Sequence, residues 1–396
     1  MGDADSGTWP RRVCILGSTG SIGSQALEII RAHAGQFEVV ALSATGVSDR
    51  SIDALMSQIS EFSPRVVAVS DEQGGARIRE LLAGATVEVL IGADAATEAA
   101  AIDCDVVLNA LAGAIGLRPS LAAVRAGRTL ALANKESLVV GGPLLMAMAA
   151  PGQVVPVDSE HSALAQCLAA GKPEEISRLV LTASGGAFRK FTPEQLANVT
   201  VEKALKHPNW EMGPLVTINS ATMVNKGLEL IEAHLLFGIS YDCIDVVIHP
   251  QQLIHSMVEF VDGATIAQAS PPDMHLPIAL GLAWPRRLVD VSPRIDWTTT
   301  HTWEFFPLDD ARFPAVSLAR AAGTAGGTHP AVFNAANEAA VAAFAGGSLK
   351  FTDIVPAIEA ALAAHSGISD DHVTLQAVLE ADAWARGYVT SAIAGA

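Results

Sequence analysis

The sequence predicts an α/β protein: a doubly wound parallel sheet at the N-terminus, then a smaller α+β part and a helical C-terminal part. Three observations carry this prediction. Short β-branched runs alternate with helical stretches over residues 12–157, a second group of strand-like runs follows up to residue 269, and Ala-rich helical patterns fill residues 313–396. Alternation of strands with helices is typical of a parallel sheet covered by helices.

Seven apolar runs in the N-terminal part are predicted strands: residues 12–16, 37–42, 65–69, 87–91, 105–108, 129–133 and 153–157. Amphipathic segments such as 25–33 and 76–82 are predicted helices between them. This pattern indicates one domain over residues 1–157.

The rhythm changes after residue 158. Residues 179–182, 216–219, 246–249, 256–261 and 264–269 are predicted strands of a second sheet, with a hairpin turn at Asp262-Gly263. A helix is expected over residues 220–237. We therefore expect a second domain over 158–284, an irregular linker over 285–312, and a third domain over 313–396 with helices at 333–344, 354–365 and 374–385.

Composition excludes several classes of partner. The chain of 396 residues has a formal charge of −17 and a sequence pI near 5.0. Nucleic acids and anionic membranes bind basic surfaces, so neither is an expected partner. Four scattered cysteines without a C-x-x-C pair indicate reduced thiols, and the N-terminus lacks the apolar stretch of a signal peptide. We expect a cytoplasmic protein.

A glycine-rich loop follows the first predicted strand. Gly17, Gly20 and Gly23 have the spacing that permits a tight turn, close approach of a pyrophosphate, and packing of the following helix. The alternative is a purely structural turn. After the second strand no acidic residue appears before Asp49, and Arg50 is close by, which favours NADPH over NAD; Arg50 could equally be a solvated surface residue.

Carboxylates occur where ligands gather in such folds. Asp158 and Glu160 follow the last strand of the first sheet and would project to the same side of an extended chain. Glu229 shares one helix face with Asn225 and Lys226. Three carboxylates would suit magnesium or manganese. The alternatives are a helix cap at Asp158 and a surface salt bridge between Lys226 and Glu229.

Three further polar segments are candidates for ligand contacts. Ser184 lies in a Gly-rich turn that could bind phosphate or could be a simple turn. Residues 207–213 combine one tryptophan with Met, Pro and Gly, a composition that suits a lid over a substrate. Asn134 and Lys135 follow a predicted strand, where Asn134 could contact a cofactor and Lys135 a substrate, or Lys135 could form a solvated pair with Glu136.

These segments together resemble one family closely, the 1-deoxy-D-xylulose 5-phosphate reductoisomerases. The resemblance runs from about residue 12 to residue 390. It is carried by residues 17–23, 133–138, 156–161, 184–186, 207–213, 220–232, 249–251 and 334–338, in consistent order.

The resemblance implies a Rossmann-like NADPH domain, a catalytic and connective domain with a flap near residues 207–215 and the dimer interface, a C-terminal helical bundle, and a homodimer. It implies that NADPH is bound by Gly17, Thr19, Gly20, Ser21, Ile22, Gly23, Asn134, Glu136 and Gly213. The implied metal ligands are Asp158, Glu160 and Glu229. The implied substrate contacts are Lys135, Ser159, Glu160, Ser184, His207, Trp210, Met212, Ser220, Asn225, Lys226 and Glu229.

The implied reaction is the rearrangement and NADPH-dependent reduction of 1-deoxy-D-xylulose 5-phosphate to 2-C-methyl-D-erythritol 4-phosphate. Lys135, Asp158, Glu160 and Glu229 would be catalytic, and the ion would be Mg²⁺ or Mn²⁺, with Co²⁺ as a further candidate. Many members have a basic and an amide residue where this chain has Thr45-Gly46-Val47, so Ser48 or Arg50 would have to replace their contacts to the 2′-phosphate. Some members have a basic pair where this chain has Pro214-Leu215, so the contacts between flap and cofactor would differ.

Two other functions remain open at this point. A semialdehyde dehydrogenase would need a thioester-forming cysteine, for which Cys167 is the best-placed candidate, although it lies in an apolar helical segment. A regulator that senses NADPH without turnover would need only the nucleotide loop.

Overall fold

The structure, a computed structural model, describes residues 9–206 and 212–395. The chain forms two compact units, each built from separated segments. The first contains the chain up to Asn134 together with Met148–Asp158 and Met274–Ser292, and the second contains Lys135–Ala147, Ser159–Asp273 and Pro293–Ala396. No described helix has the length and apolar character needed to cross a membrane.

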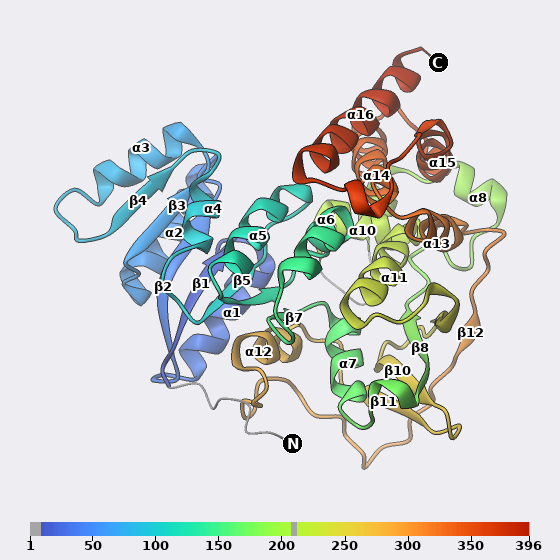
Figure 1. Cartoon of the computed structure of the whole chain (residues 1–396), viewed down its shortest axis with the longest axis horizontal. Coiled ribbons are helices and arrows are strands. Elements are labelled where there is room, and N and C mark those ends of the chain that lie inside the picture. Colours follow the sequence, from blue (N-terminus) through green and yellow to red (C-terminus); the bar gives the residue numbers. More distant parts are fainter. Residues whose placement is uncertain (1–8, 207–211, 396) are drawn as a thin grey trace. The chain divides into compact units, whose positions relative to one another are not determined.

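The first unit is a seven-stranded parallel sheet with the strand order β4-β3-β2-β1-β5-β6-β7 (Figure 1). Its strands are β1 (Arg11–Leu16), β2 (Phe37–Ala44), β3 (Val66–Val69), β4 (Glu88–Ile91), β5 (Val106–Asn109), β6 (Thr129–Leu132) and β7 (Val154–Pro156). Its helices are α1 (Ser21–Ala32), α2 (Asp49–Phe62), α3 (Glu72–Leu81), α4 (Ala95–Ala100), α5 (Leu117–Arg125) and α12 (His275–Ala283). All seven predicted strands are confirmed.

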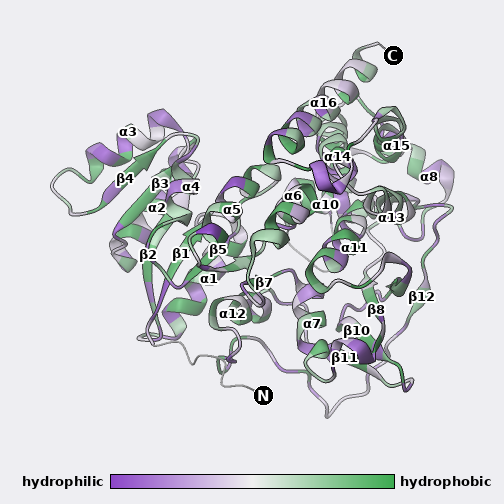
Figure 2. Cartoon of the chain, in the orientation of Figure 1, coloured by the Kyte–Doolittle hydropathy of each residue, from purple (hydrophilic) through white to green (hydrophobic). Residues whose placement is uncertain are grey.

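The burial pattern explains why this sheet is parallel. The central strands are apolar on both faces, as strands covered by helices on both sides must be. Figure 2 shows these strands mainly in the hydrophobic colour, whereas α3 is largely polar. The chain runs outward from β1 in both directions, so the strand order reverses between β1 and β5. Ligands bind beyond the carboxyl ends of strands at such a reversal.

The second unit contains a five-stranded mixed sheet with the order β11-β10-β8-β9-β12. Its strands are β8 (Ile176–Ala183), β9 (Ile244–Ile248), β10 (Ile254–Phe260), β11 (Thr265–Ala269) and β12 (Phe306–Pro307). Strands β8 and β9 are parallel, and the other pairs are antiparallel. The predicted hairpin at Asp262-Gly263 connects β10 to β11, and Gly263 has the positive φ that this turn requires.

The helices of the second unit fall into two sets. Those near the sheet are α6 (Lys135–Met148), α7 (Ser159–Leu168), α8 (Pro193–Ala197), α9 (Val201–Ala204), α10 (Pro214–Ala221) and α11 (Val224–Phe237). The C-terminal set is α13 (Ala315–Ala325), α14 (His329–Ala345), α15 (Ile354–Ala364) and α16 (Leu375–Ala394). Helix α14 packs against α13, α15 and α16, so it is the central helix of this set (Figure 1).

Two expectations for this region are wrong. Residues 216–219 are not a strand but lie inside α10, and the helix expected over 220–237 begins only at Val224. Pro214 at the first helical position starts α10 and overrides the strand propensity of the β-branched residues that follow. Met223 adopts the left-handed conformation and separates α10 from α11. Helix α12 and strand β12 were not predicted.

The second unit has its own apolar core, distinct from that of the first. It joins residues of the sheet, α10, α11 and the C-terminal helices. Phe333 on α14 is the largest fully buried side chain among the residues that the structure describes. Gly227 of α11 lies so close to α13 that an added Cβ would be 2.7 Å from the Cβ of Ala319. The C-terminal helices are therefore packed directly on the helix that carries Glu229.

We expect Phe333→Ala to lower the free energy of unfolding of the second unit by about 3–5 kcal/mol, because it removes a buried ring and leaves a cavity. Thermal unfolding followed by near-ultraviolet circular dichroism measures the change. Val289→Ala, at a position that is 73% exposed and outside both apolar cores, is the control and should change the transition little. Equal effects of the two substitutions would contradict this account of the core.

Candidate active site

The nucleotide loop predicted from the glycines joins β1 to α1. Gly17 has a φ of +79°, and a Cβ there would lie 2.7 Å from the carbonyl oxygen of Ala110. A Cβ on Gly23 would lie 2.3 Å from the carbonyl oxygen of Gly17, so the helix can approach the strand only with glycine there. No side chain caps the N-terminus of α1 at Gly20. The amides of the first turn can therefore bind a phosphate.

The two predicted contact residues that follow β6 lie in different surroundings: Asn134 is in a loop, and Lys135 begins α6. Asn134 is buried, and its amide donates to the carbonyl oxygens of Leu111 (2.7 Å) and Gly113 (2.9 Å), so it holds the turn after β5 in place. Lys135 and Glu136 open α6 and are also buried. A solvated Lys135–Glu136 pair is therefore excluded.

Two lysines and two carboxylates meet at the centre of the second unit. Lys135 donates to Glu229 Oε1 over 2.7 Å and to Asn225 Oδ1 over 3.2 Å. Lys226 Nζ lies 3.1 Å from Glu160 Oε1 and also forms an ion pair with Glu229. Helices α6 and α7 thus contribute one charged side chain each, and α11 contributes two. A surface salt bridge is excluded because Lys226 and Glu229 are 4% and 1% exposed.

Asp158 directly precedes α7 and completes a possible metal site. One oxygen of each of Asp158, Glu160 and Glu229 lies within 4.8 Å of the others, and all three residues are buried. The expected extended conformation is wrong, because Ser159 and Glu160 already form the first turn of α7. The carboxylates nevertheless converge, since Glu229 on α11 approaches the start of α7.

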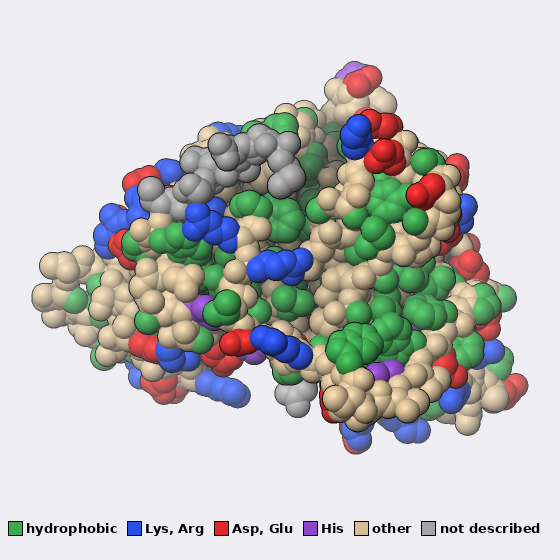
Figure 3. Space-filling view, turned by 90° about the horizontal axis from the view of Figure 1, so that it is seen from below, with side chains coloured by type: hydrophobic (Ala, Val, Ile, Leu, Met, Phe, Trp, Pro, Cys, Tyr) green, Lys and Arg blue, Asp and Glu red, His purple; other side chains and the backbone are tan. Residues whose placement is uncertain are grey.

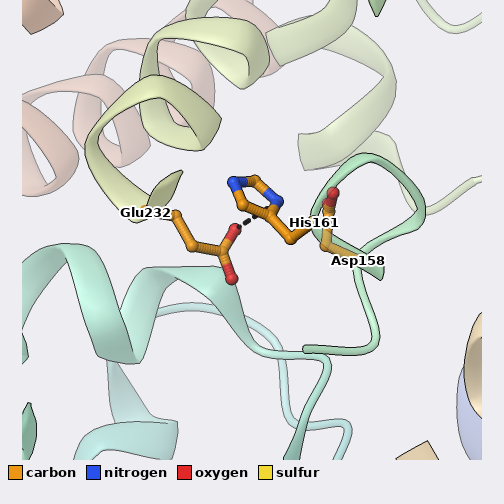
Figure 4. Close-up of side chains that lie close together, drawn as sticks. All are labelled: Asp158, His161 and Glu232. Carbon is orange, nitrogen blue, oxygen red and sulfur yellow. Dashed lines mark ion pairs between the residues drawn. The ribbon is translucent and has the colours of Figure 1, made fainter. Parts of the chain in front are cut away.

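A second ion pair lies directly behind this group. His161 Nδ1 is 3.2 Å from Glu232 Oε2, and both side chains are fully buried (Figure 4). The other ring nitrogen, Nε2, donates to the backbone carbonyl oxygen of Glu229 over 2.8 Å. The ring therefore contacts α11 through both nitrogens, one at the backbone of Glu229 and one at the side chain of Glu232.

The sequence argument missed His161 and Glu232 as members of the site. The available signal was the spacing of Glu229 and Glu232, which places them on one face of α11. Asp158, His161 and Glu232 form a second group of atoms within 4.8 Å of one another. Among the described residues, this buried region therefore holds four carboxylates together with two lysines and His161, and a divalent cation bound there would offset negative charge.

His255 on β10 is a further residue without a predicted role. Its Nε2 donates to the carbonyl oxygen of Ser270 over 3.2 Å, and it is 5% exposed. Burial lowers the pKa of His255, and the positive charge of Lys226 lowers it further, against the raising effect of the bond to Ser270. Its ring is therefore neutral at neutral pH, so it adds no positive charge next to Lys226.

The predicted phosphate loop follows β8 as expected. The backbone amide of Gly186 donates to Ser184 Oγ over 3.1 Å. A Cβ on Gly186 would lie 2.6 Å from the carbonyl oxygen of Ser220, so the loop packs on the C-terminal end of α10. Two segments proposed to bind phosphate therefore touch each other, although 36 positions separate Ser184 from Ser220.

The predicted lid is only partly described. His207 and Trp210 lie outside the described residues. The carbonyl oxygen of Met212 accepts a hydrogen bond from Thr217 Oγ1 over 3.3 Å, and Gly213 is the N-cap of α10. Ser159 donates to Glu160 Oε2, which orients that carboxylate.

The cysteine required for a thioester mechanism is unsuitable. Cys167 lies in α7 and is 3% exposed. Burial raises the pKa of its thiol to about 11. A thiol that stays protonated near neutral pH is a poor nucleophile, so this structure does not support the dehydrogenase alternative.

We expect Glu232→Ala to lower the free energy of unfolding by about 3 kcal/mol, because it leaves His161 without its buried partner. Glu232→Gln should cost less, since a polar group remains beside the ring. Thermal unfolding measures both. Glu259→Ala, which removes a surface ion pair with Arg178, serves as the control and should cost under about 1 kcal/mol. A neutral Glu232→Ala would show that the pair does not hold α7 and α11 together.

Comparison with known proteins agrees with this geometry. Residues 13–142 match the sequence profile described as 1-deoxy-D-xylulose 5-phosphate reductoisomerase, residues 154–237 that of its C-terminal domain, and residues 269–388 that of the DXP reductoisomerase C-terminal domain. The 1-deoxy-D-xylulose 5-phosphate reductoisomerase of Kitasatospora griseola is 57% identical over 387 residues, covering 96% of this chain and 100% of that protein. The enzyme of the same name from Paenarthrobacter aurescens is 54% identical over 386 residues, covering 95% and 96%.

Solved structures give the same result. A DOX-P reductoisomerase in complex with NADPH, fosmidomycin and magnesium has a TM-score of 0.90 and 38% identity, covering 97% of this chain and 98% of that one. The 1-deoxy-D-xylulose 5-phosphate reductoisomerase from Zymomonas mobilis in complex with NADPH has a TM-score of 0.89 and 40% identity, covering 97% and 99%. The chain belongs to the 1-deoxy-D-xylulose 5-phosphate reductoisomerase family.

Proposed function

We propose that this chain converts 1-deoxy-D-xylulose 5-phosphate to 2-C-methyl-D-erythritol 4-phosphate, using NADPH and a divalent cation, Mg²⁺ or Mn²⁺. The single observation that carries the proposal is the buried convergence of Asp158, Glu160 and Glu229. A solved relative is in complex with NADPH, fosmidomycin and magnesium, which supports NADPH and a divalent cation as the cofactors.

The donor set fits the cation. All three ligands supply carboxylate oxygens, which magnesium and manganese prefer. When bound, the cation would act as a Lewis acid toward the ketone and hydroxyl oxygens of the substrate, and NADPH would supply the hydride. Co²⁺ also accepts such ligands, and metal availability as well as affinity would decide which ion is bound in the cell.

The chain's own residues position the cation ligands and the substrate. Lys135 holds Glu229 and Asn225 in place and can transfer or stabilise charge at a substrate oxygen. His161 fixes the backbone at Glu229. Lys226 contacts Glu160 and Glu229, two of the carboxylates that would hold the cation. With those carboxylates on a cation, its ammonium group would be available to an anion.

The substrate phosphate would be bound by a group of side chains at the β8 loop and the α10–α11 junction: Ser184, Ser220, Asn225 and Lys226. Their separation from the reacting carbons lets phosphate binding energy assist the reaction from a distance. Ser159, His207, Trp210 and Met212 would complete the substrate contacts, and residues 207–215 would act as a flap that excludes water.

NADPH would be bound by the β1–α1 loop: Gly17, Thr19, Gly20, Ser21, Ile22 and Gly23, with Asn134, Glu136 and Gly213 as further contacts. Ser48 caps α2 through its own side chain, which accepts from the amide of Ser51. Arg50 is exposed at the start of α2 and is the available cation for the 2′-phosphate.

We expect Glu229→Gln to retain the fold and NADPH affinity while lowering metal-dependent turnover by at least about 100-fold, since even residues that only orient a metal ligand cost about 10–100-fold. Oxidation of NADPH followed at 340 nm, with titration of Mg²⁺ and Mn²⁺, measures the effect. Glu359→Gln on the exposed face of α15 is the matched control. A turnover near that of the wild type would remove Glu229 from the metal site. Wild-type protein that binds NADPH and leaves the absorbance unchanged with substrate present would favour the sensor alternative.

We also propose that the protein is a homodimer that uses the edge of the second sheet. Strand β11 is an edge strand in which three of the five residues are exposed. Ile266 in this strand and Val261 in the preceding turn are exposed apolar residues. Figure 3 shows apolar side chains gathered on part of the molecular surface. Exposed edge strands pair readily with another chain.

We expect Ile266→Glu to convert the dimer to a monomer, because a buried unpaired carboxylate at the interface is costly. Light scattering coupled to gel filtration gives the mass. Leu81→Glu, at an exposed apolar position of the first unit, is the control and should leave the mass unchanged. A monomeric wild type would exclude the dimer.

We further propose a cytoplasmic location. All four cysteines are free in the structure, as is usual in a reducing compartment. Cell fractionation with an antibody against the protein tests this.

A further inference from the structure

A buried hydrogen bond connects the C-terminal helices to the proposed phosphate site. Asn337 Nδ2 on α14 donates to Asn219 Oδ1 on α10 over 3.0 Å. Asn337 is 0% exposed and Asn219 is 1% exposed. Their helical neighbours, such as Ile218 and Ala336, belong to the apolar core. A single polar contact in apolar surroundings favours one orientation of the two helices over others.

The contact is costly for the protein, which argues against a simple packing role. Among the described atoms, Oδ1 of Asn337 is buried and has no hydrogen-bond partner. A buried acceptor without a partner destabilises the folded state, whereas an apolar side chain at the same position would not. The pair therefore lowers stability relative to apolar packing. Asn334 on the same helix shares this cost, so what distinguishes Asn337 is its bond to α10.

What the bond holds is the end of α10. Asn219 is followed by Ser220, and α10 ends at Ala221. The carbonyl oxygen of Ser220 accepts from the amide of Met223 over 3.2 Å, and Met223 takes the left-handed conformation from which α11 begins. Asn225 and Lys226 lie in the first turn of α11. The position of α10 therefore sets where Ser220 lies relative to these two side chains.

A second close contact restrains the end of α10. Gly186 of the Ser184 loop packs on the backbone of Ser220, because even a Cβ on Gly186 would lie 2.6 Å from the Ser220 carbonyl oxygen. Helix α10 thus contacts both the β8 loop and Asn337. Loss of the Asn337 bond would allow α10 to shift away from the loop.

We infer that Asn337 is a positioning residue for phosphate binding: through Asn219 it holds α10 so that Ser220 faces the same anion as Ser184, Asn225 and Lys226. This inference rests on the proposed phosphate role of that group. It gives the C-terminal helices a function in substrate affinity, although Asn337 itself need not touch the substrate.

The test is a double-mutant cycle of Asn337→Ala and Asn219→Ala in the full-length enzyme. We expect Asn337→Ala to raise the KM for 1-deoxy-D-xylulose 5-phosphate and the inhibition constant of inorganic phosphate by about threefold to tenfold, the range for loss of one hydrogen bond. The Kd for NADPH should not change. In the Asn219→Ala background, Asn337→Ala should have no further effect on KM, because the path through Asn219 is already lost.

Asn334→Ala is the matched control. Asn334 lies one turn earlier on α14, is also 0% exposed, and has an unpartnered Oδ1, but its amide donates to Glu338 and not to α10. It should lower the melting temperature without changing KM.

Three results would overturn the inference: a lower melting temperature with unchanged KM in Asn337→Ala, an equal rise in KM in Asn334→Ala, or a full effect of Asn337→Ala in the Asn219→Ala background. If Asn337→Ala does not fold, Asn337→Leu fills the space without the donor and is judged by the same results. Ser220→Ala separates this inference from the proposed phosphate site. A raised phosphate inhibition constant in Ser220→Ala alone would overturn only the role of Asn337, and no change in either variant would overturn both.

Discussion

The structure of the second unit depends on how it accommodates buried carboxylates. Glu160 and Glu229 are nearly inaccessible to water and lie close together, which would be strongly unfavourable without compensating charge. Lys135 and Lys226 supply that compensation from α6 and α11. Helix α11 carries a member of each of these ion pairs, so it joins α6 to α7 through buried charges.

This constraint links stability to function. A buried group of charges that is complete in the folded protein fixes the geometry of its members, as a metal site requires. The ion pair of His161 and Glu232 extends the same arrangement behind Glu229, so that both the side chain and the backbone of Glu229 are held. The polar interior is therefore a means of positioning, and its cost in stability is offset by the large apolar core around it.

The arrangement also explains why helices remote in sequence are joined. The C-terminal helices pack on α11 through Gly227 and on α10 through Asn337. Both α10 and α11 carry residues of the proposed substrate site. A family whose chemistry needs a sugar phosphate, a cation and a nucleotide requires several elements to be held at fixed distances, and a rigid helical layer behind α10 and α11 provides this.

Sequence alone determined the parts of this protein that depend on local patterns. The seven strands of the first sheet follow from apolar runs, and the nucleotide loop follows from glycines at positions where a side chain would collide with the backbone. The three carboxylates of the proposed metal site, Asp158, Glu160 and Glu229, were also identified from the sequence, together with the family resemblance that joined them. These features are encoded by neighbours along the chain.

Only the tertiary structure decided the rest. The segment 216–219 has strand-forming residues, yet it is helical because Pro214 starts a helix and the core surrounds it. Nothing in the sequence pairs Lys135 with Glu229, His161 with Glu232, or Asn219 with Asn337, because each pair is separated by many residues and its contact depends on how whole helices pack. Local patterns specify which conformations a segment favours, whereas burial and packing determine which distant side chains meet.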